Sequence, residues 1–139
     1  MAALGLEAAR RFPVRIQADV ELARRSGRML ATTLGFGKDD VERVVLTVSE
    51  LATNLVRYAV EGEVLLSVAD SPGGRGLRIE SRDAGPGIAD LEAALRDGES
   101  TAGSLGSGLA GVERLMDDMT ISSAADGTSI VVFKWLSIP

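Results

Sequence analysis

Two residues whose side chains could take part in chemistry, Glu50 and Asn54, lie four residues apart in the valine-rich segment 41–60. If this segment is a helix, the two side chains are neighbours on one face, separated by about 40° around the axis. A carboxylate beside an amide oxygen can accept a proton and bind a hard cation. The alternative is that both residues lie on the solvent-exposed face of a helix, and the pair alone does not exclude it.

A second candidate, residues 106–111, has the sequence Gly-Ser-Gly-Leu-Ala-Gly and formally matches the pattern GxGxxG. A dinucleotide-binding fold requires a strand directly before this pattern, and residues 99–104 do not read as a strand. No Lys-Ser/Thr pair follows the glycines, so a P-loop is excluded as well. A glycine-rich loop that begins a helix can still bind phosphate through free backbone N–H groups. The alternative is a flexible linker.

A third candidate is the segment 83–88, Asp-Ala-Gly-Pro-Gly-Ile, which ends an alternating run. Asp83 lies where a strand ends and a side chain can face a ligand, while Gly85 and Gly87 allow close backbone approach. The alternative is an Asx turn, in which the Asp83 carboxylate accepts a hydrogen bond from its own backbone. Gly127-Thr128 is a weaker signal, and alone it indicates a hairpin turn.

Composition restricts the chemistry that this chain can perform. The 139 residues include no cysteine and no histidine. Disulfides, thiolate metal sites, a cysteine nucleophile and Ser-His-Asp catalysis are therefore excluded. The net charge of −5 disfavours binding to nucleic acid or to an anionic membrane. No apolar run is long enough to span a bilayer, and we expect a cytoplasmic protein.

The elements that must position these residues follow from periodicity and turn signals. The valine-rich stripe of segment 41–60 predicts a central helix that packs on a sheet, capped by Asp39 or Asp40 and ended by Gly62. Asp19 is the expected N-cap of a preceding helix that ends at Gly35. The other expected elements are strands 12–16, 63–70, 76–83, 119–123 and 128–136, a short helix in 90–97, a mobile loop in 99–107 and a helix over 109–118.

This order of elements predicts an α+β fold. We expect a two-layer sandwich, with a mixed and mostly antiparallel sheet and helices on one face. Residues 1–11 read as a partly ordered leader, and residues 12–139 as a single domain.

Order and spacing together are more specific than any single motif. The runs 50–54, 83–88, 103–109 and 127–128 resemble, in this order, the GHKL ATP-binding superfamily, which has the Bergerat fold. Within it, the chain is most similar to the RsbT type of stand-alone bacterial serine/threonine kinase, on the runs 97–101, 108–117 and 134–136. The RsbW and SpoIIAB anti-sigma kinases more often carry a histidine shortly after the asparagine, where this chain has Arg57-Tyr58-Ala59.

The resemblance implies ATP and Mg²⁺ as cofactors and a role for each site residue. Glu50 would be the general base, Asn54 would coordinate Mg²⁺, and Asp83 would accept from the adenine amino group. Residues 98–107 would form a lid. It contains no lysine, so Arg96 and Arg114 are the nearest candidates for a γ-phosphate contact. The implied nucleotide-binding set is Asn54, Asp83, Gly85, Gly87, Ile88, Gly103, Leu105, Gly106, Ser107, Gly108, Leu109 and Thr128.

The resemblance also implies partners. An RsbT-type kinase phosphorylates STAS-domain antagonists in a stressosome module and then activates a PP2C-type phosphatase. An RsbW-type protein would instead sequester a sigma factor and phosphorylate its anti-anti-sigma antagonist. Two further hypotheses are a binding module with ATP as a structural ligand, and a structural domain without nucleotide. A homodimer is compatible with the sequence.

Overall fold

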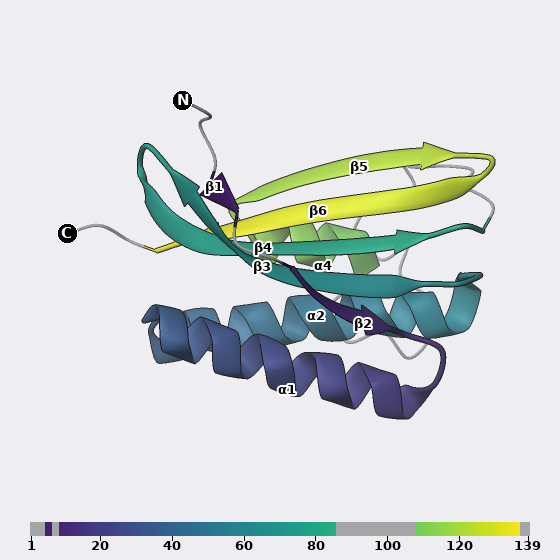
Figure 1. Ribbon diagram of the computed structural model, residues 1–139, viewed down its shortest axis with the longest axis horizontal. Coiled ribbons are helices and arrows are strands. Elements are labelled where there is room, and N and C mark those ends of the chain that lie inside the picture. Colours follow the sequence, from purple (N-terminus) through teal and green to yellow (C-terminus); the bar gives the residue numbers. More distant parts are fainter. Residues whose placement is uncertain (1–4, 7–8, 86–107, 137–139) are drawn as a thin grey trace.

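A computed structural model describes residues 5–6, 9–85 and 108–136 of the chain. Within these described ranges, three helices lie on one face of an antiparallel sheet (Figure 1). The predicted α+β sandwich is confirmed, and all strand pairs among the described residues are antiparallel. The described residues contain no helix long and apolar enough to cross a membrane.

The strands of the sheet follow the order β1-β3-β4-β6-β5, and β2 also pairs with β3. The predicted strands after the central helix are confirmed within one or two residues at each end. Their bounds are β1 Gly5–Leu6, β2 Arg10–Pro13, β3 Glu63–Ser71, β4 Gly74–Asp83, β5 Asp118–Ala124 and β6 Gly127–Trp135.

The N-terminal strand differs from its prediction. The strand expected over 12–16 begins at Arg10 and ends at Pro13. Arg10 pairs with Leu66 and Pro13 with Glu63, so β2 lies along the first half of β3. Beyond it, β1 pairs with the last part of β3, through Gly5 opposite Asp70. Parts of segment 1–11 therefore belong to the sheet.

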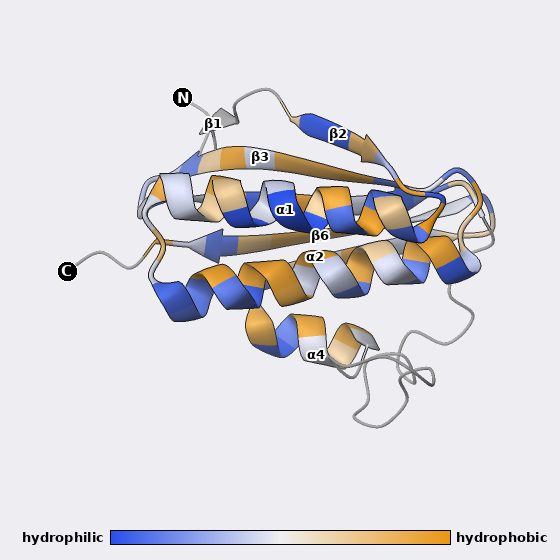
Figure 2. Ribbon diagram, turned by 90° about the horizontal axis from the view of Figure 1, so that it is seen from below, coloured by the Kyte–Doolittle hydropathy of each residue, from blue (hydrophilic) through white to orange (hydrophobic). Residues whose placement is uncertain are grey.

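The helical layer has α2, Lys38–Tyr58, between α1, Gln17–Leu34, and α4, Gly108–Leu115 (Figure 2). The apolar stripe of α2 packs toward the sheet as predicted, and Val44, Val48 and Leu51 are at most 1% exposed. A Cβ added at Gly27 of α1 would lie 3.2 Å from Val48 Cγ2. The missing side chain at this position therefore lets α1 and α2 approach closely.

The predicted helix caps were wrong at two N-termini. Ile16 is the N-cap of α1, and Asp19 lies three residues later. The Asp19 carboxylate accepts hydrogen bonds from the backbone N–H groups of Arg15 and Ile16, at 2.9 and 3.1 Å. These two bonds lower the pKa of Asp19. The residue thus satisfies free donors at the start of the helix from inside the first turn.

The central helix also begins and ends at other residues than expected. Gly37 is its N-cap, and Asp39 and Asp40 lie in its first turn, where their charges favour the positive end of the helix dipole. The helix stops at Tyr58, with Ala59 as C-cap, rather than at Gly62. For α1, the predicted end is confirmed, because Gly35 closes the helix with φ of 100°.

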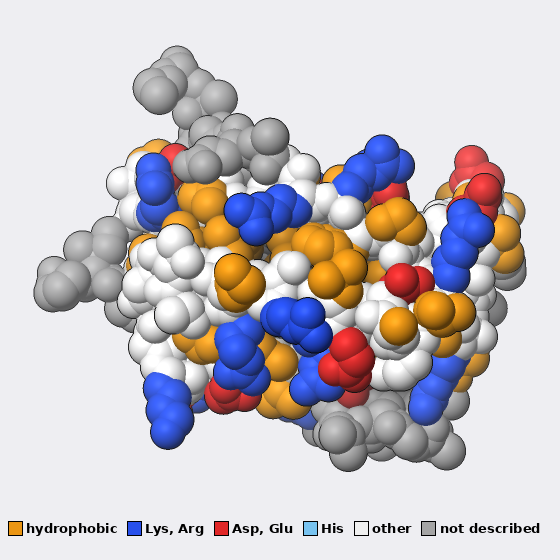
Figure 3. Space-filling view, turned by 60° about the horizontal axis from the view of Figure 1, so that its bottom comes forward, with side chains coloured by type: hydrophobic (Ala, Val, Ile, Leu, Met, Phe, Trp, Pro, Cys, Tyr) orange, Lys and Arg blue, Asp and Glu red, His pale blue; other side chains and the backbone are white. Residues whose placement is uncertain are grey.

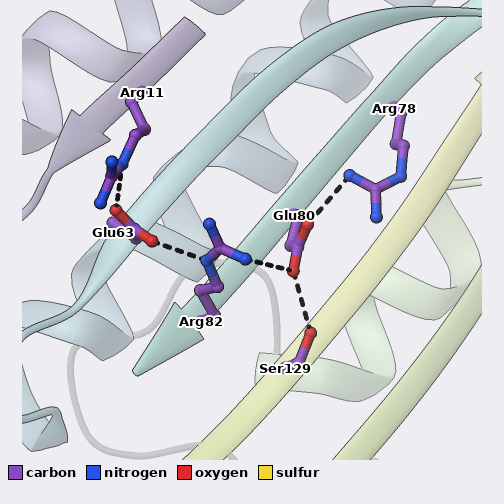
Figure 4. Close-up of polar contacts among 6 residues, drawn as sticks. All are labelled: Arg11, Glu63, Arg78, Glu80, Arg82 and Ser129. Carbon is purple, nitrogen blue, oxygen red and sulfur yellow. Dashed lines mark hydrogen bonds and ion pairs between the residues drawn. The ribbon is translucent and has the colours of Figure 1, made fainter. Parts of the chain in front are cut away.

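The two surfaces of the sandwich differ in character. On the outer surface of the helices, Lys and Arg side chains are interspersed with hydrophobic ones (Figure 3). The sheet face away from the helices carries positive and negative side chains of β2, β3 and β4, joined to a serine of β6 (Figure 4). Glu63 accepts from Arg11 at 2.7 Å and from Arg82 at 2.6 Å. Glu80 accepts from Arg78 at 2.9 Å and from Ser129 at 3.2 Å.

Candidate active site

Helix α2 carries the first two candidate residues in its second half. Glu50 is only 7% exposed, although it lies on the side opposite the valine stripe. Asn54, one turn later, is partly buried. The interpretation that Glu50 lies on a solvated helix face is therefore wrong, because other parts of the protein cover its side chain. A carboxylate held at a buried position is typical of a functional or structural site.

The ends of three neighbouring strands supply a second polar group. Asp83, the last residue of β4, pairs with Thr128 of β6, and Thr128 pairs with Ser123 of β5. Thr128 is 8% exposed, and its hydroxyl lies 3.2 Å from the Ser123 hydroxyl. Sequence reasoning missed Ser123. Its alternation with Met119 and Ile121 along β5 indicates the same face as Thr128 and is the signal that could have found it.

The Asx turn considered as an alternative for Asp83 is present. Asp83 Oδ1 accepts a hydrogen bond from the backbone N–H of Gly85 at 2.8 Å. A Cβ at Gly85 would lie 3.3 Å from both this oxygen and the Val60 nitrogen. A Cβ at Gly127 would lie 2.4 Å from the Asp83 carbonyl oxygen. The turn therefore fixes one carboxylate oxygen, and two glycines leave the space that it needs.

A backbone hydrogen bond joins the two polar groups. The N–H of Ala84 donates to the carbonyl of Val60 at 2.9 Å, so the end of β4 is bonded to the segment that follows α2. The end of β4, which carries Asp83, therefore lies beside the C-terminal end of α2, on the side of the molecule where β5 ends and β6 begins (Figure 1).

Helix α4 begins at Gly108, which has φ of 66°, and it packs against α2. Leu109 is 6% exposed, so it anchors the first turn of α4 in the core. The predicted helix over 109–118 is confirmed with an end at Leu115. Of the glycine-rich run, only Gly108 and the residues after it are described.

The far end of α4 is held by one lysine of β6. Lys134 Nζ donates to the carbonyl of Leu115 at 3.3 Å and lies 3.4 Å from Asp117 Oδ1. It also lies 3.6 Å from Asp40 Oδ1, in the first turn of α2. A cation at a helix C-terminus interacts favourably with the helix dipole. Lys134 therefore ties α4 to α2, the helix that carries Glu50 and Asn54.

Several predicted features lie outside the described residues. These are the short helix in 90–97, the lid over 98–107, Arg96, and the site residues Gly87, Ile88, Gly103, Leu105, Gly106 and Ser107.

Arg57 is a positive side chain near Asn54 that the sequence analysis did not consider for a contact with the γ-phosphate. Arg57 is exposed in the last turn of α2, three residues after Asn54, and residues at this spacing are neighbours on a helix. The same i, i+3 spacing is visible in the sequence. Arg114, the earlier candidate, is exposed in the last turn of α4.

Comparison with known proteins gives the class of this chain. The family model for the histidine kinase-like ATPase domain matches residues 12–135. Serine/threonine-protein kinase RsbT of Bacillus subtilis is 44% identical over 119 residues, which are 85% of this chain and 90% of the relative.

Two solved structures share the fold. The RsbU and RsbW domains of a Mycobacterium tuberculosis protein align with a TM-score of 0.66 and 21% identity over 96% of this chain. The match spans only 34% of that longer chain. The histidine kinase domain of an Erythrobacter litoralis blue-light activated histidine kinase aligns with a TM-score of 0.50 and 21% identity, over 84% of this chain and 63% of that one.

The chain therefore belongs to the histidine kinase-like ATPase domain family, within the GHKL superfamily. Within that family it is an ATP-dependent serine/threonine kinase of the RsbT type.

Proposed function

We propose that the chain transfers the γ-phosphate of Mg·ATP to a serine or threonine of a STAS-domain antagonist, in a cytoplasmic stressosome module, and then activates a PP2C-type phosphatase. The observation that carries this proposal is the 44% identity to RsbT over 90% of that protein. The backbone bond that holds the end of β4, with Asp83, beside the C-terminal end of the helix that carries Glu50 and Asn54 supports it. Phosphoryl transfer needs mainly positioning and charge stabilisation, which these groups can supply.

The side-chain oxygen atoms on α2 suit a magnesium ion that is bound mainly through ATP. The described residues contain no cluster of three acidic or other metal-ligating side chains. Mg²⁺ needs only one or two protein ligands when phosphate oxygens and water complete its shell. The Asn54 amide oxygen would be such a ligand, and the metal would neutralise charge on the phosphates.

Recognition of adenine would use the free side of Asp83. Its Oδ1 already accepts from Gly85 N at 2.8 Å, which orients the carboxylate. Oδ2 would then accept from the adenine amino group, and the Thr128 hydroxyl would support the base. Gly85 contributes by leaving room, since a side chain there would contact Asp83 and Val60.

Glu50 would act on the incoming hydroxyl. Its burial excludes much of the solvent, which strengthens its electrostatic effect on the acceptor. As general base, or as the group that orients the hydroxyl, it would hold the attacking oxygen in line with the γ-phosphate. Gly108 and Leu109, at the positive end of α4, would offer backbone N–H groups to the phosphates.

The test is transfer of radiolabelled γ-phosphate from Mg·ATP to STAS-domain proteins encoded by the same genome. We expect label on serine or threonine with the wild type and with Gln17→Ala, which removes an exposed amide from α1. Asn54→Ala should lose transfer. If Mg·ATP is bound but no STAS-domain protein is labelled, the proposed substrate class is wrong. Binding of the chain to a sigma factor encoded by the same genome would then favour the RsbW type.

A further inference from the structure

Five side chains form a stripe along one face of α2, in which Glu50 is buried and the others are exposed or partly exposed: Arg43, Leu46, Glu50, Thr53 and Arg57. They recur at steps of three and four residues, so they share one face of the helix. The buried carboxylate of Glu50 lies at the centre of this stripe. It is the residue that the proposed function places beside the phosphoacceptor.

Leu46 is the apolar member of the stripe, and it is 42% exposed. It lies four residues before Glu50 and therefore about 40° from it around the helix. Thr53, one turn after Glu50, is partly exposed. A single exposed leucine needs no explanation elsewhere on a protein. Here Leu46 is the exposed apolar side chain that shares the helix face of Glu50, one turn before it.

The exposed charges of the stripe are both positive, although the whole chain has a net charge of −5. Arg43 forms an ion pair with Asp40 at 2.9 Å, and both groups remain partly exposed. For Arg57, the described residues provide no ion pair or hydrogen bond. The two arginines are fourteen residues apart, which is about 21 Å along a helix axis.

The surface of the helical layer as a whole has a similar mixture of side chains. Lys and Arg side chains lie next to exposed hydrophobic ones, with fewer acidic groups between them (Figure 3). Apolar contact with charged groups at the rim is the usual composition of a protein–protein interface. The matching partner surface would carry one apolar side chain flanked by carboxylates.

We propose that the stripe is the docking surface for the acceptor segment of the phosphoacceptor protein. An apolar residue of that segment packs on Leu46, its carboxylates pair with Arg43 and Arg57, and its hydroxyl reaches Glu50. Leu46 is then a specificity residue that touches the protein substrate and not the nucleotide. This inference rests on the proposed function and adds where the substrate binds and what flanks its serine or threonine.

The test compares Leu46→Asp with a matched control, Leu22→Asp. Leu22 is 49% exposed on the outer face of α1, so it has the same side chain and similar exposure away from the stripe. The dissociation constant is measured for the labelled STAS-domain protein and, separately, for Mg·ATP. A minority of interface side chains are hot spots, and changing one of these weakens binding by about tenfold or more.

We expect Leu46→Asp to weaken binding of the STAS-domain protein at least about tenfold, with Leu46→Ala intermediate and Leu22→Asp unchanged. All variants should keep the wild-type affinity for Mg·ATP. Equal effects of Leu46→Asp and Leu22→Asp, or none from Leu46→Asp, would overturn the docking surface while phosphate transfer persists. If the wild type binds Mg·ATP but no STAS-domain protein, both the inference and the proposed substrate class are wrong.

Discussion

At the scale of single residues, the two carboxylate oxygens of Asp83 have separate roles, one structural and one proposed for ligand binding. One carboxylate oxygen closes the Asx turn through Gly85 N, and the other is proposed to accept from adenine. The sequence suggested these as alternatives, but the geometry makes them compatible. A carboxylate that is oriented by a backbone bond loses little freedom when it binds a ligand.

Asp83→Asn tests this division of labour. The asparagine side-chain oxygen can still accept from Gly85 N, so the fold should be retained. Its NH₂ group would then face the adenine amino group as a second donor, and we expect ATP affinity to fall by about tenfold or more. Calorimetric titration with Mg·ATP measures this. Asp126→Asn, in the β5–β6 turn, is the control, and equal affinity of the two variants would remove Asp83 from adenine binding.

At Gly127, the absence of a side chain lets the backbone of β6 lie close to the backbone of Asp83. A Cβ at this position would lie 2.4 Å from the carbonyl oxygen of Asp83, and a backbone atom cannot move aside cheaply. We expect Gly127→Ala to lower the free energy of unfolding by about 1–3 kcal/mol. Chemical denaturation measures the loss.

Gly73→Ala is the matched control, because its added Cβ meets only Ser71 Oγ, at 3.9 Å. Its stability should change little. A Gly127→Ala protein as stable as Gly73→Ala would show that the contact at Asp83 relaxes without cost.

At the scale of elements, sequence reasoning succeeded where patterns are strong. The alternation of Leu77, Ile79 and Ser81 predicted β4, and all three side chains are buried. It failed where a signal is short or ambiguous. β1 has two residues and no periodicity. Asp19 has the sequence signature of an N-cap, yet it lies three residues after the N-cap, where its carboxylate accepts hydrogen bonds from the backbone N–H groups of Arg15 and Ile16.

The candidate site was predictable in part for the same reason. Helical spacing placed Glu50 and Asn54 on one face, and the ends of predicted strands placed Asp83 and Thr128. Spacing alone could not show that Glu50 is buried, since burial depends on what packs over that face. The pairing of Ser123 with Thr128 depends on the exact turn between β5 and β6, because turn type and loop length fix the register of a hairpin.

The charged row on the open face of the sheet links several strands, and Glu63 is its best-paired carboxylate. Hydrogen bonds from Arg82 and then Arg11 lower the pKa of Glu63. A group with a lowered folded-state pKa stabilises the protein above its unfolded-state pKa. That stability is lost as pH falls through the folded-state pKa.

We therefore expect Glu63→Gln to cost about 1 kcal/mol of unfolding free energy at pH 7, since the pair is partly exposed. The difference from wild type should shrink as the pH falls through about 4.3, where the unfolded-state carboxyl is half protonated, toward the lower folded-state pKa. Denaturant unfolding at pH 7 and at pH 3 measures this. Glu113→Gln, exposed on α4, is the control, and a pH-independent cost for Glu63→Gln would contradict the electrostatic origin.

At the scale of the whole molecule, the proposed nucleotide site would join α2 to the end of β4 and the start of β6, while Lys134 joins α2 to α4. A ligand that contacts these elements together should stabilise the entire fold. At a free concentration of one hundred times the dissociation constant, Mg·ATP should add about 2.7 kcal/mol to the free energy of unfolding.

Thermal unfolding with Mg·ATP, and with ATP plus a chelator, measures this stabilisation. We expect the chelator to remove most of it, and Asn54→Ala to behave with magnesium as the wild type does without it. Equal stabilisation of Asn54→Ala and wild type by Mg·ATP would exclude Asn54 as the metal ligand.

The most direct test of the proposed role of Glu50 in phosphate transfer is a comparison of Glu50→Gln with wild type. Both affinity for Mg·ATP and transfer of its γ-phosphate to a STAS-domain protein are measured, with Glu21→Gln on α1 as control. We expect Glu50→Gln to keep the wild-type affinity for Mg·ATP and to lose phosphate transfer by about a hundredfold or more. Full transfer by Glu50→Gln would contradict the central claim that this buried carboxylate acts on the acceptor hydroxyl.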